Sequence, residues 1–167
     1  LLGGGDDRTP YVLRPPRAGD VTFTTSRQAA LYAREYGWDA GFEALVARIG
    51  ADFIERHDPA RERCWIAERH GDIVGSIYVV QHSKTVAQLR LLYVEPGARG
   101  LGLGRRLVEE ALAFARETGY RKVILWTHDV LVAARTLYRD LGFARTAGET
   151  HQRFGKAVVA ETWEIAL

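Results

Sequence analysis

The residues with the clearest chemical potential are residues 99–104, which read Arg-Gly-Leu-Gly-Leu-Gly. This turn follows an apolar stretch typical of a strand, residues 86–94, and precedes an amphipathic stretch typical of a helix, residues 101–117. A glycine-rich turn that opens a helix can hold phosphate, because the first N–H groups of the helix have no intrahelical partner and its dipole favours negative charge. The arginine that begins the turn, together with Arg105 and Arg106, adds positive charge, so the pattern predicts a phosphate-binding turn.

Two common phosphate-binding motifs do not fit this turn. The P-loop requires Gly-Lys-Ser/Thr after its glycines, whereas Gly104 is followed by arginine. The dinucleotide fingerprint Gly-x-Gly-x-x-Gly/Ala fails in both frames. Its last position is Arg105 when the motif begins at Gly100, and Leu107 when it begins at Gly102. A glycine-rich turn without any ligand remains the alternative interpretation.

A third pattern, Arg-x-x-Gly-x-Gly, is complete, with Arg99, Gly102 and Gly104 in place. It resembles the acyl-CoA pyrophosphate loop of the GNAT family, the Gcn5-related N-acetyltransferases. A second segment, residues 134–143, reads Ala-Arg-Thr-Leu-Tyr-Arg-Asp-Leu-Gly-Phe and is similar to the family pattern Ala-x-x-x-Tyr-x-x-x-Gly-Phe. Two markers separated by one strand and one turn are much harder to obtain by chance than either alone, so the chain is identified as resembling this family.

The order of the expected elements is consistent with this resemblance. Strands are expected at residues 11–14, 64–68, 73–80, 86–94, 122–127, 143–150 and 158–166, helices at 27–36, 39–57, 101–117 and 131–141, and residues 19–25 are β-rich and ambiguous. This order predicts an α+β fold, with helices packed on a mixed sheet. The resemblance covers residues 11–167 and implies the GNAT fold, a mostly antiparallel sheet with flanking helices. In that fold the parallel central strands, here 86–94 and 122–127, splay apart.

The 167 residues suit one domain, expected over residues 11–167, with residues 1–10 as a linker or tag remnant. A net charge of +2 gives no reason to expect nucleic acid or a membrane as a partner. No apolar stretch is long enough to span a bilayer. The single cysteine, Cys64, cannot form an internal disulfide, which predicts a cytoplasmic location. The 5 histidines show no metal-ligand spacing, so no metal is expected.

A narrower resemblance concerns residues 34–39, 64–68 and 161–164. These segments are similar to the acetyltransferase half of bacterial fusion proteins, in which a MarR-type winged helix-turn-helix regulator precedes the GNAT domain. The chain contains no methionine, so we expect that further sequence precedes residue 1 in the parent protein. The edge strands of the last hairpin, residues 143–166, could pair between two subunits, which would give a homodimer.

The family resemblance implies an N-acetyltransferase that uses acetyl-CoA. A primary amine of a small molecule or peptide would attack the thioester directly in a ternary complex. That reaction requires a held cofactor, a stabilised oxyanion, and proton transfer from the amine and to the leaving thiolate. The resemblance implies that the cofactor is contacted by Leu92, Tyr93, Val94, Arg99, Gly100, Leu101, Gly102, Leu103, Gly104, Arg105, Thr127, Arg135 and Tyr138.

The expected general acid is Tyr138, because a phenol has a pKa near 10 and could protonate a thiolate while remaining neutral at pH 7. A plain core aromatic is the alternative role for this residue. The chain departs from the family at Leu131, where many members have a cofactor-contacting Asn, and at Gln88, where many have Glu. No single general base is identifiable, and the remaining candidates are Glu35, Asp39, Glu43, Glu95 and His128. A water chain or an already neutral amine would remove the need for a side-chain base.

Residues 32–43 are dense in aromatic and charged side chains, and the resemblance places them on the acceptor side. Tyr32, Glu35 and Trp38 are therefore the candidate substrate-binding residues, with ordinary packing as the alternative.

Three tryptophans in strands, Trp65, Trp126 and Trp163, are expected in the core, as is Cys64. The missing Asn and Glu keep a second function open, a CoA-binding sensory module attached to a transcriptional regulator, with little turnover. Transfer of a longer acyl group is a third possibility.

Overall fold

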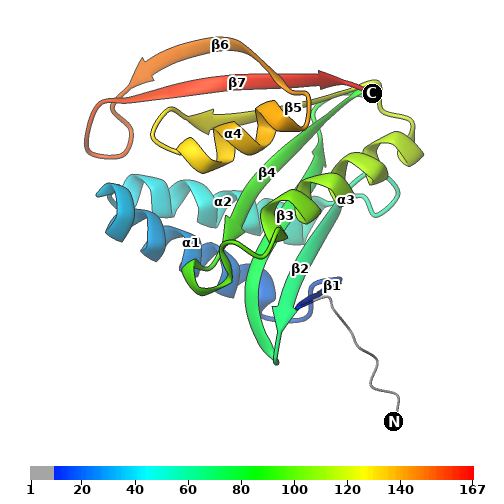
Figure 1. Ribbon diagram of the computed structural model, residues 1–167, viewed down its shortest axis with the longest axis horizontal. Coiled ribbons are helices and arrows are strands. Elements are labelled where there is room, and N and C mark those ends of the chain that lie inside the picture. Colours follow the sequence, from blue (N-terminus) through cyan, green and yellow to red (C-terminus); the bar gives the residue numbers. More distant parts are fainter. Residues whose placement is uncertain (1–9) are drawn as a thin grey trace.

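The structure, a computed structural model, describes residues 10–167 and contains a seven-stranded sheet with helices on both of its faces (Figure 1). The strand order is β1-β2-β3-β4-β5-β7-β6. Every neighbouring pair is antiparallel except β4 and β5, which run parallel. The predicted α+β class and its mixed sheet are therefore confirmed, whereas the linker predicted at the N-terminus falls almost wholly outside the described residues.

The elements follow the expected order. The strands are β1 (Val12–Arg14), β2 (Arg63–Arg69), β3 (Asp72–Gln81), β4 (Val86–Val94), β5 (Lys122–His128), β6 (Ala144–His151) and β7 (Val158–Ala166), and the helices are α1 (Asp20–Tyr36), α2 (Ala40–Arg56), η1 (Pro96–Ala98), α3 (Leu103–Thr118) and α4 (Val132–Asp140). Within residues 10–167, no helix combines the length and the hydrophobicity needed to cross a membrane.

Helix α1 begins earlier than the sequence suggested, because most of the β-rich stretch at 19–25 is helical. The threonines there satisfy their hydroxyl groups within the helix. Thr24 donates a hydrogen bond to the Val21 carbonyl at 3.1 Å, and Thr25 donates to the same carbonyl at 3.0 Å. Tertiary packing also favours the helix over a strand here, because Val21 and Thr24 are buried against the sheet. Burial thus outweighs the modest helix penalty of β-branched residues.

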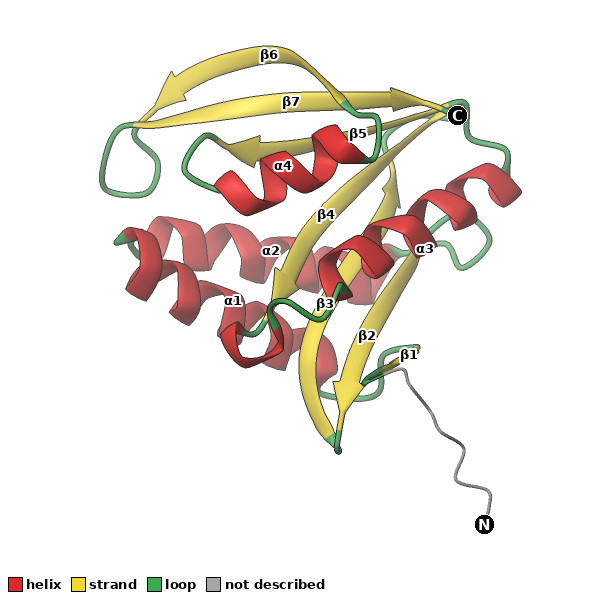
Figure 2. Cartoon of the chain, in the orientation of Figure 1, coloured by secondary structure: helices red, strands yellow, loops and turns green. Residues whose placement is uncertain are grey.

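The sheet separates two layers of helices, as Figure 2 shows: α3 crosses in front of β3 and β4, whereas α2 passes behind them. The largest cluster of buried residues lies between α3 and the sheet and includes Leu107, Val108 and Leu89. A second cluster lies under α1 and α2, where Val21 and Phe53 pack together with residues of β2 and β3. Because successive side chains of a strand point to opposite faces of the sheet, apolar residues of the strands reach both clusters.

Two of the three tryptophans are in the core as predicted, since Trp65 and Trp163 are buried. The prediction for Trp126 was wrong, because 59% of this residue is exposed. Its neighbours Leu125 and Thr127 are buried, so the alternation of β5 turns Trp126 to the opposite face, where it is exposed although Ile124 on the same face is buried. Cys64 is buried as expected, and burial raises the pKa of its thiol to about 12.

A β-bulge in β4 interrupts the centre of the sheet. Leu91 has a positive φ of 53°, which is uncommon for a residue other than glycine, and the β3–β4 register shifts at the same place. A bulge bends its strand and increases the local twist. The parallel ladder with β5 accordingly ends at the pair Leu89–Leu125, and the last residues of β4 have no partner on β5 in this ladder.

Gly75 in β3 lets β4 and the start of α3 approach closely. A Cβ atom at this position would lie 2.7 Å from the Tyr93 carbonyl oxygen and 3.1 Å from Leu103 Cδ2. We therefore expect Gly75→Ala to lower the free energy of unfolding by about 1–3 kcal/mol, measured by urea denaturation. Gly97→Ala is the matched control, because nothing lies within 4 Å of the corresponding Cβ position. Equal stability of the two variants would contradict this interpretation.

Candidate active site

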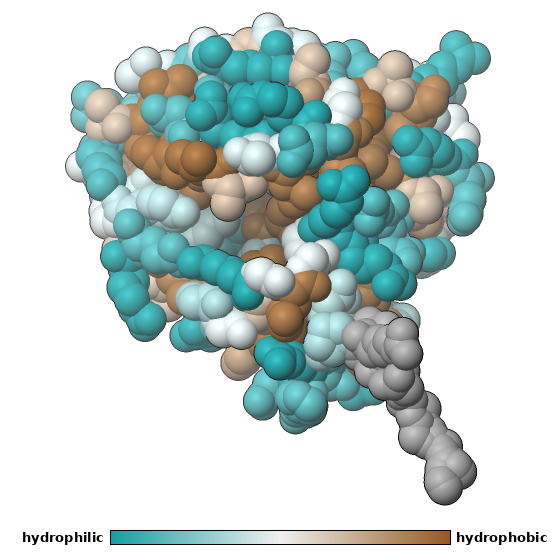
Figure 3. All heavy atoms as spheres, viewed as in Figure 1, coloured by the Kyte–Doolittle hydropathy of each residue, from teal (hydrophilic) through white to brown (hydrophobic). Residues whose placement is uncertain are grey.

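The splay between β4 and β5 opens a space at the centre of the molecule. If the parallel register continued past Leu89, Leu92 would face His128, so these two residues mark opposite walls of the opening. In the space-filling view, hydrophobic residues surround a hollow where α4, α1 and the start of α3 approach one another (Figure 3). The hollow therefore adjoins both the free end of β4 and the glycine-rich turn.

The glycine-rich turn has the backbone geometry expected of an anion site. Gly100 and Gly102 have φ values of 85° and 73°, conformations that other residues rarely adopt. Gly102 is the N-cap of α3, and no side chain caps this end of the helix. A Cβ atom at either glycine would meet no atom within 4 Å. The first N–H groups of α3 thus face open space without an intrahelical acceptor.

The arginines around the turn already have partners. Arg99 forms two hydrogen bonds to the Glu35 carboxylate, at 2.6 and 3.1 Å. Arg105 lies 3.3 Å from Glu109 one turn further along α3. Glu35 is therefore tied to the turn instead of contributing an unpaired carboxylate to the acceptor side. An anion bound at the turn would compete with Glu35 for the Arg99 guanidinium.

Tyr138 lies on α4 and is buried, 5.7 Å from Phe143 and 6.5 Å from Trp163 between ring centroids. Burial, and to a smaller extent the nearby Tyr32 phenol, raises the pKa of Tyr138 above its usual value. Its hydroxyl group makes no hydrogen bond to any residue in the described part of the chain. Tyr138 is therefore a neutral phenol with a proton available to a ligand.

Arg135, predicted to contact the cofactor, is engaged elsewhere. Its guanidinium binds the buried Glu161 carboxylate of β7 at 2.8 and 3.2 Å. Arg145 and the Trp163 indole N–H contact the same carboxylate, at 3.2 and 3.1 Å. The ion pair fixes α4 to β7 and thereby holds Tyr138 in place. Thr127, also predicted to contact the cofactor, is buried opposite Glu161 in the β5–β7 ladder.

Helix α1 holds the end of β4 through polar contacts. Arg27 forms two hydrogen bonds of 2.8 Å to Glu95, and the Tyr93 hydroxyl donates to the same carboxylate. The Arg27 guanidinium holds the pKa of Glu95 below its usual range. Gln28 donates a hydrogen bond of 3.2 Å to the Leu92 carbonyl. These contacts fix the backbone immediately beyond the bulge.

The structure distinguishes among the candidate bases. Glu35 and Glu95 are paired with arginines, and Asp39 caps α2 by accepting a hydrogen bond of 2.8 Å from the Gly41 N–H. Glu43 is an exposed residue in the first turn of α2. His128 alone among the five lies at the end of β5 on a wall of the opening.

His128 is half-buried in a cluster of aromatic rings. Its Nε2 atom lies 3.0 Å from the Nε2 atom of His151, and its ring centroid lies 5.0 Å from that of Trp38. Burial, followed by the neighbouring His151, lowers the pKa of His128 to about 4. The imidazole is therefore neutral near pH 7 and is a weaker base than a solvent-exposed histidine.

Two of the three predicted acceptor residues belong to this aromatic cluster. Tyr32 stacks on Phe42 with ring centroids 5.1 Å apart and meets Trp38 edge-on at 5.5 Å. Trp38 is almost fully buried, and its indole N–H has no hydrogen-bond partner within the described residues. Trp38 is therefore packed inside the cluster, whereas Tyr32 is half-buried and near enough to Tyr138 to contribute to its raised pKa.

Four residues of the site were not among the sequence predictions: Arg27, Gln28, Arg90 and His151. Arg27, Gln28 and His151 act through partners that are distant in the sequence. Arg90, in β4, makes no hydrogen bond or ion pair with any of residues 10–167. One signal could have found Arg90, because it interrupts the apolar run of strand 86–94. A charged residue in the middle of a central strand is unusual without a functional reason.

Comparison with known proteins agrees with this geometry. Residues 26–143 match the model of the Acetyltransferase (GNAT) family. A mycothiol acetyltransferase of Geodermatophilus obscurus is 40% identical over 137 residues, which cover 78% of this chain and 42% of that protein. An N-acetyltransferase of Schizosaccharomyces pombe is 30% identical over 122 residues, covering 72% of this chain and 74% of the relative. The chain therefore belongs to the GNAT acetyltransferase family.

The chain is shorter than several of these relatives, since it spans only 26% of a mycothiol acetyltransferase of Cellulomonas flavigena. Solved structures share the fold. A ribosomal-protein-alanine N-acetyltransferase from Brucella melitensis has a TM-score of 0.73 at 20% identity, covering 93% of this chain and 99% of that one. A protein from Salmonella typhimurium solved with its cofactor acetyl-CoA has a TM-score of 0.73 at 18% identity, covering 95% and 94%. The GNAT fold is thus confirmed.

The lowered pKa of His128 predicts a pH dependence of stability. Because the unfolded state binds this proton near pH 6.5 and the folded state only near pH 4, the stabilisation is complete above pH 6.5 and is lost as the pH falls toward 4. We expect wild type to lose about 1–2 kcal/mol more than His128→Phe over this range, a value reduced for partial exposure.

Urea denaturation at a series of pH values measures this difference. His82→Asn, at an exposed position after β3, is the control and should keep the wild-type profile. If the free energy of unfolding of wild type and of His128→Phe changed with pH in the same way, the lowered pKa of His128 would be contradicted.

Proposed function

We propose that this protein is an N-acetyltransferase that transfers the acetyl group of acetyl-CoA to a primary amine of a small molecule or peptide. The observation that carries the proposal is the opening of β4 away from β5 at the Leu91 bulge, directly beside a turn with free helix N–H groups. Membership of the GNAT family supports this combination as an acyl-transfer site. The amine attacks the thioester directly, while both are bound.

The residues of the turn fit the pyrophosphate of the cofactor. Gly100 and Gly102 leave open space where side chains would stand, and the first N–H groups of α3 supply donors. Leu92, Tyr93 and Val94 offer the free edge of β4 to the pantetheine chain, which can pair with it as an added strand. Acetyl-CoA, when bound there, supplies the acetyl group as a reactive thioester.

The residues around the opening then have distinct roles. A backbone N–H near Leu92 or Tyr93 stabilises the negative charge that develops on the carbonyl oxygen of the acetyl group. Tyr138 gives its proton to the departing thiolate, because its phenol is neutral and unbonded. His128 accepts the proton of the amine and passes it to His151, at 3.0 Å, which lies closer to solvent.

The acceptor side is formed by the groups around the far wall of the opening. Tyr32 presents a half-buried phenol there, and burial raises its pKa to about 12, so it binds as a neutral group. Glu35 holds Arg99 and acts on the acceptor only through that arginine. A preceding regulatory domain and pairing of edge strands between two subunits remain predictions from the sequence.

Two glycines at opposite ends of α3 provide a matched test of the turn. Gly102 and Gly119 both have positive φ, at 73° and 91°, and neither has an atom within 4 Å of its Cβ position. Each Gly→Ala variant should lose about 1 kcal/mol of stability through backbone strain. Only Gly102→Ala should weaken acetyl-CoA binding, by about 10-fold or more, because its methyl group occupies the phosphate site.

Isothermal titration calorimetry of both variants measures this difference in acetyl-CoA affinity. If Gly102→Ala bound acetyl-CoA as tightly as wild type, or if both variants lost the same affinity, the role of the turn in binding the cofactor would be refuted.

The general-acid role of Tyr138 predicts a specific kinetic defect. Tyr138→Phe should lower kcat by about 100-fold or more, while acetyl-CoA binding and stability stay close to wild type. Release of free CoA thiol with a panel of primary amines measures the rate. Tyr120→Phe is the control, because its phenol bonds to the Arg61 carbonyl at 2.8 Å, outside the opening. Full activity of Tyr138→Phe would show that another group protonates the thiolate.

A further inference from the structure

Arg90 is a partly buried arginine without a partner. It lies in β4 immediately before the bulge and makes no hydrogen bond or ion pair with any residue among 10–167. Arg14, Arg27 and Arg135 each bind a carboxylate, whereas the buried Nε atom of Arg69 also lacks a hydrogen-bond partner among the described residues. Burying a guanidinium costs free energy unless a counter-charge offsets it. The half-buried guanidinium of Arg90 is therefore available to the negative charge of a ligand.

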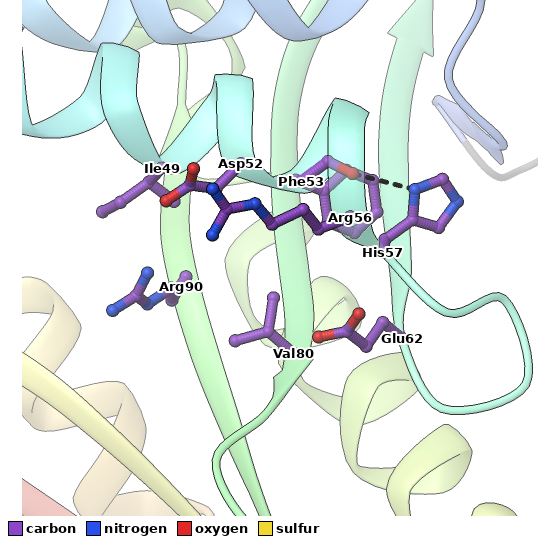
Figure 4. Close-up of a pocket in the computed structure, with 8 residues that line it drawn as sticks. All are labelled: Ile49, Asp52, Phe53, Arg56, His57, Glu62, Val80 and Arg90. Atoms are coloured by element: carbon purple, nitrogen blue, oxygen red, sulfur yellow. Dashed lines mark hydrogen bonds between the residues drawn. The ribbon is translucent and has the colours of Figure 1, made fainter.

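The surroundings of Arg90 form a cavity of about 150 Å³ between α2 and the sheet. Ile49, Phe53 and Val80 supply apolar walls, and Asp52 is the charged group whose field reaches Arg90. Figure 4 shows the Arg90 side chain extending away from Val80 and Glu62, on the same side as Ile49. Burial lowers the pKa of Arg90, and the nearby Asp52 carboxylate opposes this shift.

The position of Arg90 relates it to the reacting atoms. Pairing with Tyr78 of β3 places the side chain on the α2 face of the sheet, opposite the face covered by α3. The next two residues of β4, Leu91 and Leu92, form the bulge at which the thioester is expected. An acceptor that approaches the bulge from the α2 face therefore passes the guanidinium of Arg90.

We propose that Arg90 binds a carboxylate of the acceptor, so that the preferred substrates are amines that also carry a carboxylate, such as amino acids. This inference rests on the proposed function, because it names the substrate class of the same site. The planar guanidinium can hold a carboxylate through two parallel hydrogen bonds and so orient the amine toward the bulge. The cavity is also lined by Asp52, Arg56, His57 and Glu62. The two carboxylates repel a doubly charged phosphate more strongly than a singly charged carboxylate.

The test compares acceptors that differ only in this group. Common L-amino acids and their carboxamides are assayed as pairs by thiol release with wild type and with Arg90→Gln. We expect Arg90→Gln to raise KM for the carboxylates by about 10- to 100-fold, with little change in kcat, and to leave KM for the carboxamides and acetyl-CoA affinity unchanged. Arg90→Lys should restore part of the affinity, because it keeps the charge without the planar fork.

Arg48→Gln is the matched control, because Arg48 is an exposed arginine of α2 that does not line the cavity. The Arg48→Gln variant should leave KM and kcat for every acceptor unchanged. The inference would be overturned if wild type preferred the carboxamides, or if Arg90→Gln raised KM equally for both members of each pair. Either result would leave the acetyltransferase activity itself standing.

Binding of the same amino acids to the CoA-loaded protein, followed by calorimetry, separates the two proposals. Arg90-dependent binding without amine-dependent thiol release would support the carboxylate site and refute the proposed function. Absence of both binding and release would overturn both proposals.

Discussion

The bend in β4 at Leu91 is the constraint on which the rest of the structure depends. A leucine in the left-handed region costs roughly 1–2 kcal/mol, and here the residue at φ 53° is held by contacts with two of the hydrophobic clusters. The bulge ends the parallel pairing with β5 after Leu125 and leaves a strand edge unpaired in the middle of the sheet. An interior strand with free backbone groups is costly unless a ligand completes it. The opening is therefore best understood as a binding site built into the fold.

Helix α1 keeps this opening in one shape. Arg27 reaches Glu95 just beyond β4, and Gln28 reaches the carbonyl of Leu92, so one turn of α1 holds both sides of the bend. The opposite wall is held by Arg135, which fixes α4 to Glu161 of β7. Because these contacts are made between residues of the chain itself, they hold the opening in one shape and reduce the binding energy that is spent on ordering it.

The distribution of charge around the opening follows from the same contacts. Glu35 and Glu95 are neutralised by arginines, and Asp39 is used as a helix cap. Among the described residues around the opening, a neutral imidazole at His128, a neutral phenol at Tyr138 and a cation at Arg90 remain. This combination favours an acceptor that brings its own negative charge and loses a proton on the way to the thioester.

Much of this could be predicted from the sequence, and the reasons are local. The positive φ of Gly102, the start of α3 and the order of the elements follow from glycine spacing and hydrophobic periodicity, which act over a few residues. The tertiary structure alone decided which charges pair, since Arg99 and Glu35, or Arg135 and Glu161, come from separate elements. It also made the stretch at 20–25 helical, turned Trp126 outward and left Arg90 without a partner among residues 10–167. Such outcomes depend on which elements lie side by side once the chain has folded, and burial at those contacts outweighs local preference.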